Sequence, residues 1–102
     1  MDYKSKRWEA TRKAILRRDG YMCQECKRYG KVRDGSHVHH IFPAEHYEEY
    51  QFKYWNLITL CQACHNRMHD RDGHELSEEG EKLLERTRRK LSERTSRPAW
   101  MV

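Results

Sequence analysis

The stretch that decides the fold runs from Cys61 to His69 and reads CQACHNRMH. Its two cysteines are separated by two residues, and an earlier pair with the same spacing, Cys23 and Cys26, lies upstream. Two such pairs present four thiolates, which can close a tetrahedron around zinc without leaving a position for water. A redox pair would need a βαβ context, which is absent, and would leave the second pair without a role. The four cysteines, which include Cys64, therefore predict a structural Zn²⁺ site that staples a small domain.

The size of the chain favours such a staple. The sequence has 102 residues, of which 36% are hydrophobic and 36% are charged. Burial of its apolar side chains at best roughly balances the cost of ordering the chain, about 1.5 kcal/mol per residue, so a metal ion or a disulfide is expected. The N-terminus, MDYKSKRWEA, lacks the apolar core of a secretory signal, and no apolar run approaches the roughly 18 residues of a membrane helix. We therefore expect a cytoplasmic protein without a membrane partner, in which reduced cysteines bind metal rather than form disulfides.

Charge is distributed unevenly along the chain, whose formal net charge is +5. Residues 1–36 carry eleven Lys and Arg against five Asp and Glu, whereas residues 37–60 carry one against three. A basic flank beside a mildly acidic middle favours a nucleic-acid partner over a uniformly solvated surface.

The hydrophobic pattern predicts an α+β fold with two short strands. Ser5 is a helix cap, and Asp19-Gly20 is a helix stop. The expected elements, in chain order, are a helix over 5–18, a tight turn with the first cysteine pair over 21–30, a strand over 37–42, a loop with a short helical turn over 44–55, a strand over 57–60, a helix over 62–69 and a helix over 77–93. Residues 95–102 are expected to fray.

Several histidines gather around these elements. His39 and His40 lie at the end of the first predicted strand, and Asn56 precedes the second. His65 directly follows a cysteine and His69 lies four residues later, so their imidazoles share one face of the predicted helix. Because successive strand residues point to opposite faces, His39 and His40 are expected to face apart. One histidine is most often an ordinary core or surface residue, but four beside one zinc-stapled hairpin indicate a site.

These residues resemble the HNH endonucleases, which have the ββα-metal (His-Me finger) fold. The resemblance rests on residues 38–43 (VHHIFP), on residues 56–69 (NLITLCQACHNRMH) and on the upstream pair at 23–26 (CQEC). It covers about residues 8–70 and is closest to small, zinc-knuckled HNH proteins of phages and prophages. It implies an α+β fold in which a zinc-stapled ββα-metal core, residues 21–72, has flanking helices. Residues 1–20 would form a basic N-terminal helix, and residues 73–102 a C-terminal helix with a basic tail.

The resemblance also implies catalytic roles. His40 matches the general base, which takes a proton from the attacking water. His39, His65 and His69 match ligands of a catalytic divalent ion. Asn56 matches the central asparagine of the catalytic motif, which braces the loop between the strands through backbone hydrogen bonds. A base and a metal ligand on adjacent strand residues would normally face opposite sides of the strand. Both could still act at one site if the chain kinks before Pro43, or if a backbone carbonyl binds one nitrogen of His40 and so orients its ring.

The implied activity is metal-dependent hydrolysis of DNA, by nicking or double-strand cutting, to 5′-phosphate and 3′-hydroxyl ends. An imidazole with its ordinary pKa of about 6.5 can accept a proton near neutral pH. His39 stands where the family more commonly has Asp, so the site offers nitrogen rather than oxygen. The catalytic ion is expected among Mn²⁺, Ni²⁺, Co²⁺, Mg²⁺ and Zn²⁺. Because Mg²⁺ prefers oxygen ligands, the first three should equal or exceed Mg²⁺, while tightly held Zn²⁺ should inhibit.

DNA contacts and partners are less constrained by the sequence. Arg67, on the predicted metal-bearing helix, and Arg17 and Arg18, on the basic helix, are the candidate DNA-binding residues, with a solvated surface charge as the alternative role. Phage packaging proteins are a further candidate partner, and neither oligomeric state nor sequence preference is indicated. The alternative function is an inactive zinc-ribbon-like module that binds DNA or a packaging complex. Intact His40 and His65 argue against it, because a binder needs no base beside a metal site.

Overall fold

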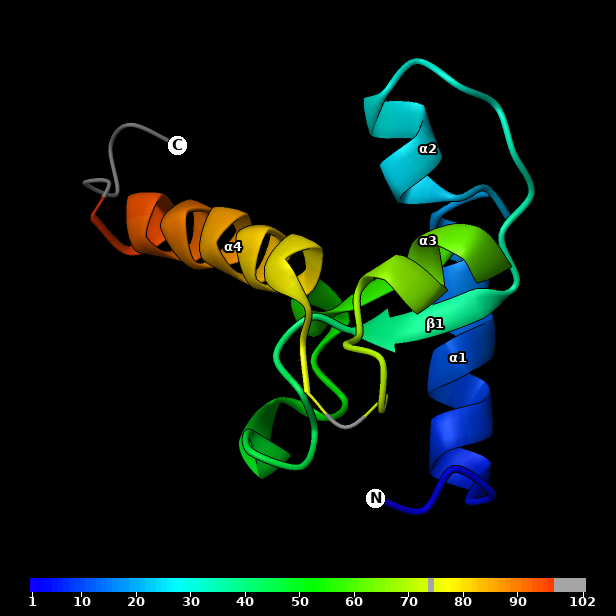
Figure 1. The fold of residues 1–102 in the computed structure, drawn as a ribbon. Coiled ribbons are helices and arrows are strands. Elements are labelled where there is room, and N and C mark those ends of the chain that lie inside the picture. The colour runs from blue at the N-terminus through cyan, green and yellow to red at the C-terminus, as the bar shows by residue number, and fades with distance from the viewer. Residues whose placement is uncertain (74, 97–102) are drawn as a thin grey trace.

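An antiparallel hairpin forms the centre of the fold in the computed structural model, which describes residues 1–73 and 75–96 (Figure 1). Its strands are β1 (His37–His40) and β2 (Leu57–Leu60), with His37 opposite Leu60 and His40 opposite Leu57. In the described part of the chain the sheet has two strands, so β1 keeps one edge unpaired. This edge is where the site described below opens.

Strand β1 ends two residues before its predicted end. The Ile41 N–H still donates to the Asn56 carbonyl (2.8 Å), but the Phe42 N–H donates to the Asn56 side chain (2.6 Å). The second bond turns the chain away from β2. The long connection that follows has two 3₁₀ turns, Glu48–Tyr50 and Tyr54–Asn56, where the sequence predicted one.

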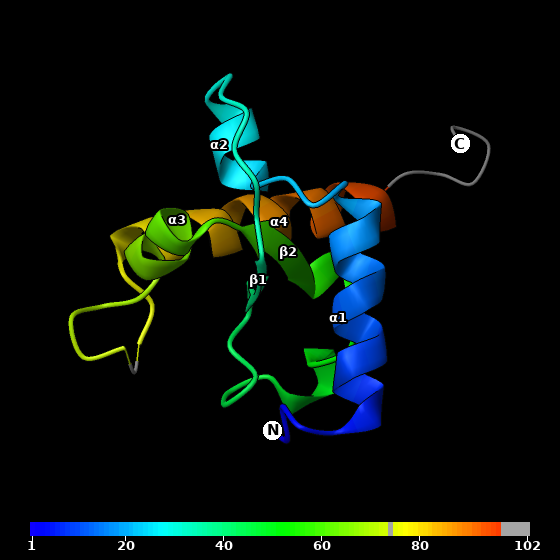
Figure 2. The same cartoon turned by 90° about the vertical axis from the view of Figure 1, so that its right-hand side faces the viewer.

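Helix α1 (Lys6–Arg18) packs along the hairpin (Figure 2). It begins as predicted at Ser5, whose hydroxyl oxygen accepts the Trp8 N–H (3.1 Å), and ends at Asp19. The face toward the hairpin is buried and includes Trp8, Ile15 and Leu16. The spacing of these apolar residues therefore places one face of a strongly basic helix against the sheet.

Polar contacts fix the C-terminal end of α1 on β2. The Asp19 carboxylate accepts the Thr59 N–H (3.0 Å). The Arg18 guanidinium donates to the carbonyls of Tyr54 (2.7 Å) and Leu57 (2.6 Å) and pairs with Asp19. The angle of α1 to the hairpin therefore rests on directed bonds as well as on apolar packing.

Both cysteine pairs begin short helices. The predicted turn after Cys23 is α2 (Gln24–Arg28), and α3 (Gln62–Arg67) follows Cys61. Helix α3 is two residues shorter than predicted. The reason is the next segment: the Ser77 N–H donates to the Met68 carbonyl (2.9 Å), and the Ser77 hydroxyl donates to the Arg67 carbonyl.

Helix α4 (Glu78–Ser96) begins at that same contact and crosses behind the hairpin in Figure 2. The Ser77 hydroxyl oxygen caps it by accepting the Gly80 N–H (3.2 Å), as predicted. The helix extends to Ser96, past its predicted end at 93, and the rest of the tail expected to fray, 97–102, lies outside the described residues. None of the described helices is long and apolar enough to cross a membrane.

The core has two parts. The smaller part lies under α1 and contains Trp8, Ile15 and Leu57. The larger part surrounds the four buried cysteines and includes residues from the hairpin, α3 and α4: Ile41, Phe42, Leu60, Met68, Leu83 and Leu84. An α+β fold with flanking helices, as predicted, is therefore organised around a thiol cluster.

Candidate active site

Four thiols meet at the junction of α2 and α3. All of their sulfur atoms lie within 4.8 Å of one another, and none is in a disulfide. The Cys26 sulfur lies 3.9 Å from that of Cys61 and 3.7 Å from that of Cys64. Zn–S bonds of about 2.3 Å in a tetrahedron place sulfur atoms about 3.8 Å apart. The cluster therefore fits zinc, as the spacing predicted.

The ionisation of these thiols also fits a cation. Burial raises the pKa of Cys26 and of Cys64 above the ordinary thiol value. Burial acts in the same direction on Cys61, but hydrogen bonds from the Cys64 N–H and the neighbouring thiols outweigh it and lower the pKa of Cys61 to about 6. Cys26 and Cys64 therefore become thiolates near pH 7 only if a positive charge lies among the sulfur atoms.

Three imidazoles meet beside this cluster. Their candidate ligand nitrogens, on His39, His65 and His69, lie within 4.8 Å of one another. His39 points from β1 toward α3, with its ring centroid 5.6 Å from that of His65 and 5.2 Å from that of His69. His65 directly follows Cys64, so the cysteine cluster holds the start of α3 against β1. His69 lies beyond the end of α3, yet its centroid is 5.1 Å from that of His65.

His39 has the surroundings of a cation ligand. Its side chain is 2% exposed, and its Nε2 atom has no hydrogen-bond partner among the described residues. Burial, followed by the nearby His69 and His65, lowers its pKa to about 3. The ring is therefore neutral near pH 7 and presents a buried lone pair, which otherwise costs free energy. Neutral imidazole nitrogens suit transition-metal ions such as Ni²⁺ and Zn²⁺ better than they suit Mg²⁺.

His40 faces the other way, toward α1, as strand alternation predicts. Its Nε2 lies 3.0 Å from the Gln51 carbonyl oxygen, and its ring stacks on Trp8 with a centroid distance of 5.0 Å. A carbonyl oxygen only accepts, so Nε2 carries the proton and Nδ1 holds the lone pair of the neutral ring. Burial lowers the pKa of His40, while the bond to Gln51 opposes that shift. The neutral, proton-accepting form is therefore favoured.

One cavity joins these two faces. It has a volume of about 540 Å³ and is lined by all four residues of β1 and by Tyr3, Trp8, Arg12, His65 and His69, among others. The unpaired edge of β1 opens into it, so His39 and His40 border the same space although their side chains point apart.

Asn56 holds together the segments that surround this cavity. It is fully buried, and its Oδ1 accepts the Phe42 N–H (2.6 Å). Its Nδ2 donates to the carbonyls of Phe42 (3.1 Å) and Tyr50 (3.2 Å). The chain leaving β1 is thereby tied to the segment that carries the Gln51 carbonyl.

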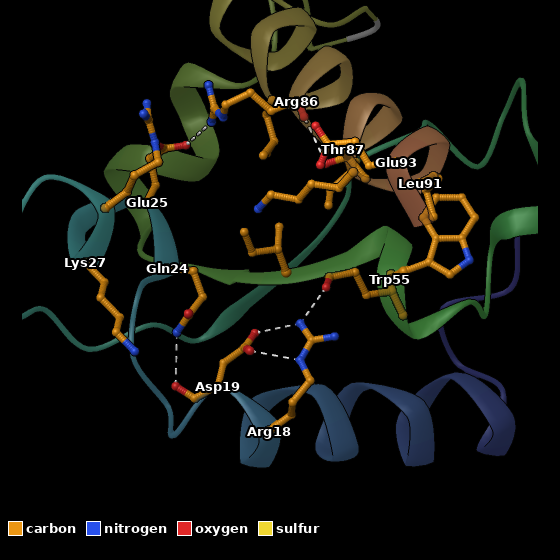
Figure 3. Close-up of a pocket in the computed structure, with 16 residues that line it drawn as sticks. Arg18, Asp19, Gln24, Glu25, Lys27, Trp55, Arg86, Thr87, Leu91 and Glu93 are labelled. Carbon is orange, nitrogen blue, oxygen red and sulfur yellow. Dashed lines mark hydrogen bonds and ion pairs between the residues drawn. The ribbon is translucent and has the colours of Figure 1, made fainter. Parts of the chain in front are cut away.

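A larger cavity, of about 740 Å³, lies between the end of α1, α2 and α4 (Figure 3). No histidine among the described residues lines it, and its charged groups are largely paired, as in the contacts of Arg18 with Asp19 and of Glu25 with Arg86. We therefore take the smaller, histidine-lined cavity as the candidate active site, because its side chains can bind a metal ion and accept a proton. We call it the histidine cavity below.

The three predicted DNA-binding arginines do not line the histidine cavity. Arg18 borders the cavity of about 740 Å³, Arg67 borders a third cavity of about 250 Å³, and Arg17 is exposed on α1. Arg12, which sequence reasoning missed, does line it, and its guanidinium donates to the Ser36 carbonyl (2.8 Å). The only sequence signal for Arg12 was its place one helical turn after Trp8.

A two-stranded hairpin followed by a helix, with imidazoles facing one another between them, is the ββα-metal architecture. A family model described as HNH endonuclease matches residues 23–71. Among solved structures, the chain is similar to the HNH endonuclease of the deep-sea thermophilic bacteriophage GVE2, whose crystal structure contains a manganese ion. The two sequences are 43% identical over the matched region. The match has a TM-score of 0.63 and covers 64% of this chain and 71% of that one. No curated protein sequence matches the chain. The chain belongs to the HNH endonuclease family.

Proposed function

We propose that the protein hydrolyses DNA phosphodiester bonds, with His39, His65 and His69 holding a divalent cation and His40 acting as the general base. Membership of the HNH endonuclease family supports nuclease activity in general, without assigning roles to residues. The residue roles rest on one observation. A buried histidine nitrogen without a hydrogen-bond partner, on His39, faces two further imidazoles beside a cavity that His40 also lines.

His40 would take the proton of the attacking water. Its Nε2 bond to Gln51 leaves Nδ1 as the accepting atom, and burial keeps the ring neutral near pH 7. A base of this kind contributes about 10²–10⁴-fold to a hydrolysis rate. The proton moves from water to Nδ1 of His40, the water oxygen bonds to phosphorus, and the bond from phosphorus to the 3′ oxygen breaks. The departing 3′ oxygen takes a proton from solvent water. The ends are then 5′-phosphate and 3′-hydroxyl.

A cation at the three imidazoles would supply Lewis-acid stabilisation of the negative charge on the departing oxygen. All three candidate ligands are nitrogens, which supports Mn²⁺, Ni²⁺ or Co²⁺ over Mg²⁺. The crystal structure of the GVE2 enzyme holds a manganese ion, which supports Mn²⁺ as one candidate. Arg12 lines the cavity and supports a contact with the substrate phosphate, because a guanidinium can bridge two phosphate oxygens.

One active site per chain makes nicking the natural event, and cutting both strands would take two visits or two copies. Similarity to a bacteriophage enzyme supports a phage or prophage source, with packaging proteins as a candidate partner. Free, buried thiols suited to zinc are typical of reducing compartments, which supports the bacterial cytoplasm as the place of action.

Cleavage of supercoiled plasmid tests the proposal. With Mn²⁺, the protein should relax or linearise plasmid, and His40→Ala should do neither while keeping its zinc and its melting temperature. His46→Ala is the matched control, because His46 is half-exposed, borders none of the cavities described above and pairs with Glu75 (3.7 Å). If plasmid stays intact with Mn²⁺, Ni²⁺, Co²⁺ and Mg²⁺ but shifts on a gel, the protein is the binding module instead.

A further inference from the structure

The proposed base, His40, is enclosed by aromatic residues that lie before the segment matched by the family model. Trp8, on α1, is 5% exposed and stacks on the imidazole, with centroids 5.0 Å apart and planes 21° apart. Tyr3 meets both rings edge-on, 5.5 Å from the centroid of Trp8 and 6.1 Å from that of His40. Both aromatic residues line the histidine cavity.

Two contacts together restrict the imidazole. The hydrogen bond from Nε2 to the Gln51 carbonyl fixes one atom of the ring but permits rotation of the ring plane about that bond. The indole of Trp8 covers one face of the ring, so the same rotation would drive the imidazole into it. Only with both contacts is the direction of the Nδ1 lone pair defined.

The indole is itself held firmly. Trp8 packs in the smaller core with Ile15 and Leu57, which are almost fully buried. The bonds of Asp19 and Arg18 to β2 and to the segment before it fix the other end of α1. The position of the Trp8 indole is therefore set by its core packing and by the placement of α1, and does not depend on His40.

We propose that Trp8 is a positioning residue of the proposed nuclease: its indole orients the His40 ring so that the lone pair of Nδ1 points into the histidine cavity. The inference rests on the proposed function for its catalytic consequence. Helix α1, which lies before the residues 23–71 that the family model matches, would then be part of the active site.

Steady-state cleavage of a DNA duplex with Mn²⁺ tests the consequence. Trp8→Leu keeps an apolar side chain but removes the stacking face, and we expect kcat to fall about 10- to 100-fold with KM changed less than about threefold. Trp8→Phe restores an aromatic face and should keep kcat within about threefold of the wild-type value. Ile15→Ala is the control, since it opens the same core without contacting His40. A purely structural role would instead lower kcat equally in Trp8→Leu and Ile15→Ala, and that result would overturn the proposal.

Proton NMR of the imidazoles tests the positioning without cleavage. The His40 ring signals, assigned by their loss in His40→Gln, should lie upfield in the wild type and in Trp8→Phe because of the ring current, and return downfield in Trp8→Leu. Unchanged His40 signals in Trp8→Leu would overturn the proposal at any level of activity. A wild-type protein that leaves DNA intact would overturn the nuclease function, while these signals would still decide whether Trp8 fixes the ring.

Discussion

Changing Asn56 to Asp replaces one NH₂ group by an oxygen and leaves the side-chain volume almost unchanged. The acceptor of the Phe42 N–H is kept, but the two donated bonds to the carbonyls of Phe42 and Tyr50 are lost. An ionised carboxylate would face those two carbonyl oxygens inside the protein. A protonated one would donate to one of them, but holding a carboxyl of ordinary pKa near 3.9 protonated at pH 7 costs about 4 kcal/mol. We expect Asn56→Asp to lose about 3–5 kcal/mol of unfolding free energy at pH 7, a large part of a typical total of about 5–15 kcal/mol.

The sign of the pH dependence follows from the same group. Burial and the two carbonyls raise the pKa of the introduced carboxyl in the folded state, so the folded protein binds more protons than the unfolded one. The stability difference from wild type should therefore shrink as pH falls from 7.5 to 6.0, by up to about 1.4 kcal/mol per pH unit.

Urea unfolding of the zinc-loaded proteins measures both quantities, with wild type and variant compared at each pH. Asn66→Asp is the control, because Asn66 is exposed on α3 and the bond that it accepts from Gln62 (3.0 Å) is kept by a carboxylate oxygen. It should change stability by less than about 0.5 kcal/mol. An Asn56→Asp protein within about 1 kcal/mol of wild type at pH 7.5 would refute the argument that Asn56 ties the two segments by hydrogen bonds.

Three further predictions concern zinc, the α3–α4 junction and the catalytic ion. Cys26→Ser should abolish cooperative melting, because structural zinc contributes about 10–16 kcal/mol in zinc-finger peptides, and unchanged melting would contradict the zinc site. Gly80→Ala should lower the melting temperature, since a Cβ at Gly80 would overlap the Met68 carbonyl oxygen. Such overpacking costs about 1–3 kcal/mol, against a helix-propensity gain of about 1 kcal/mol, and a raised melting temperature would show that α4 shifts freely. Plasmid cleavage with Mn²⁺, Ni²⁺ or Co²⁺ should equal or exceed that with Mg²⁺, and strict dependence on Mg²⁺ would contradict the all-imidazole ligand set.

Local patterns explain what the sequence could predict. The spacing of the cysteines indicated their cluster, and alternation along β1 placed His39 and His40 on opposite faces. The position of α3 followed as well, because Cys61 and Cys64 hold its start.

Contacts between distant segments explain the rest. The stacking of Trp8 on His40 depends on the angle of α1, which is fixed by bonds such as that between Asp19 and Thr59, 40 residues apart. The early end of α3 depends on Ser77, ten residues beyond Arg67. No periodicity within one element encodes these pairings, so Arg12 and Trp8 were not recognised as residues of the cavity.

A single peptide bond separates the thiol cluster from the imidazole cluster, since Cys64 and His65 are consecutive. The two clusters are therefore linked directly through the backbone of α3. If the cysteines hold a structural ion, its loss would move His65, so the affinity of the three histidines for a cation would depend on an intact cysteine cluster.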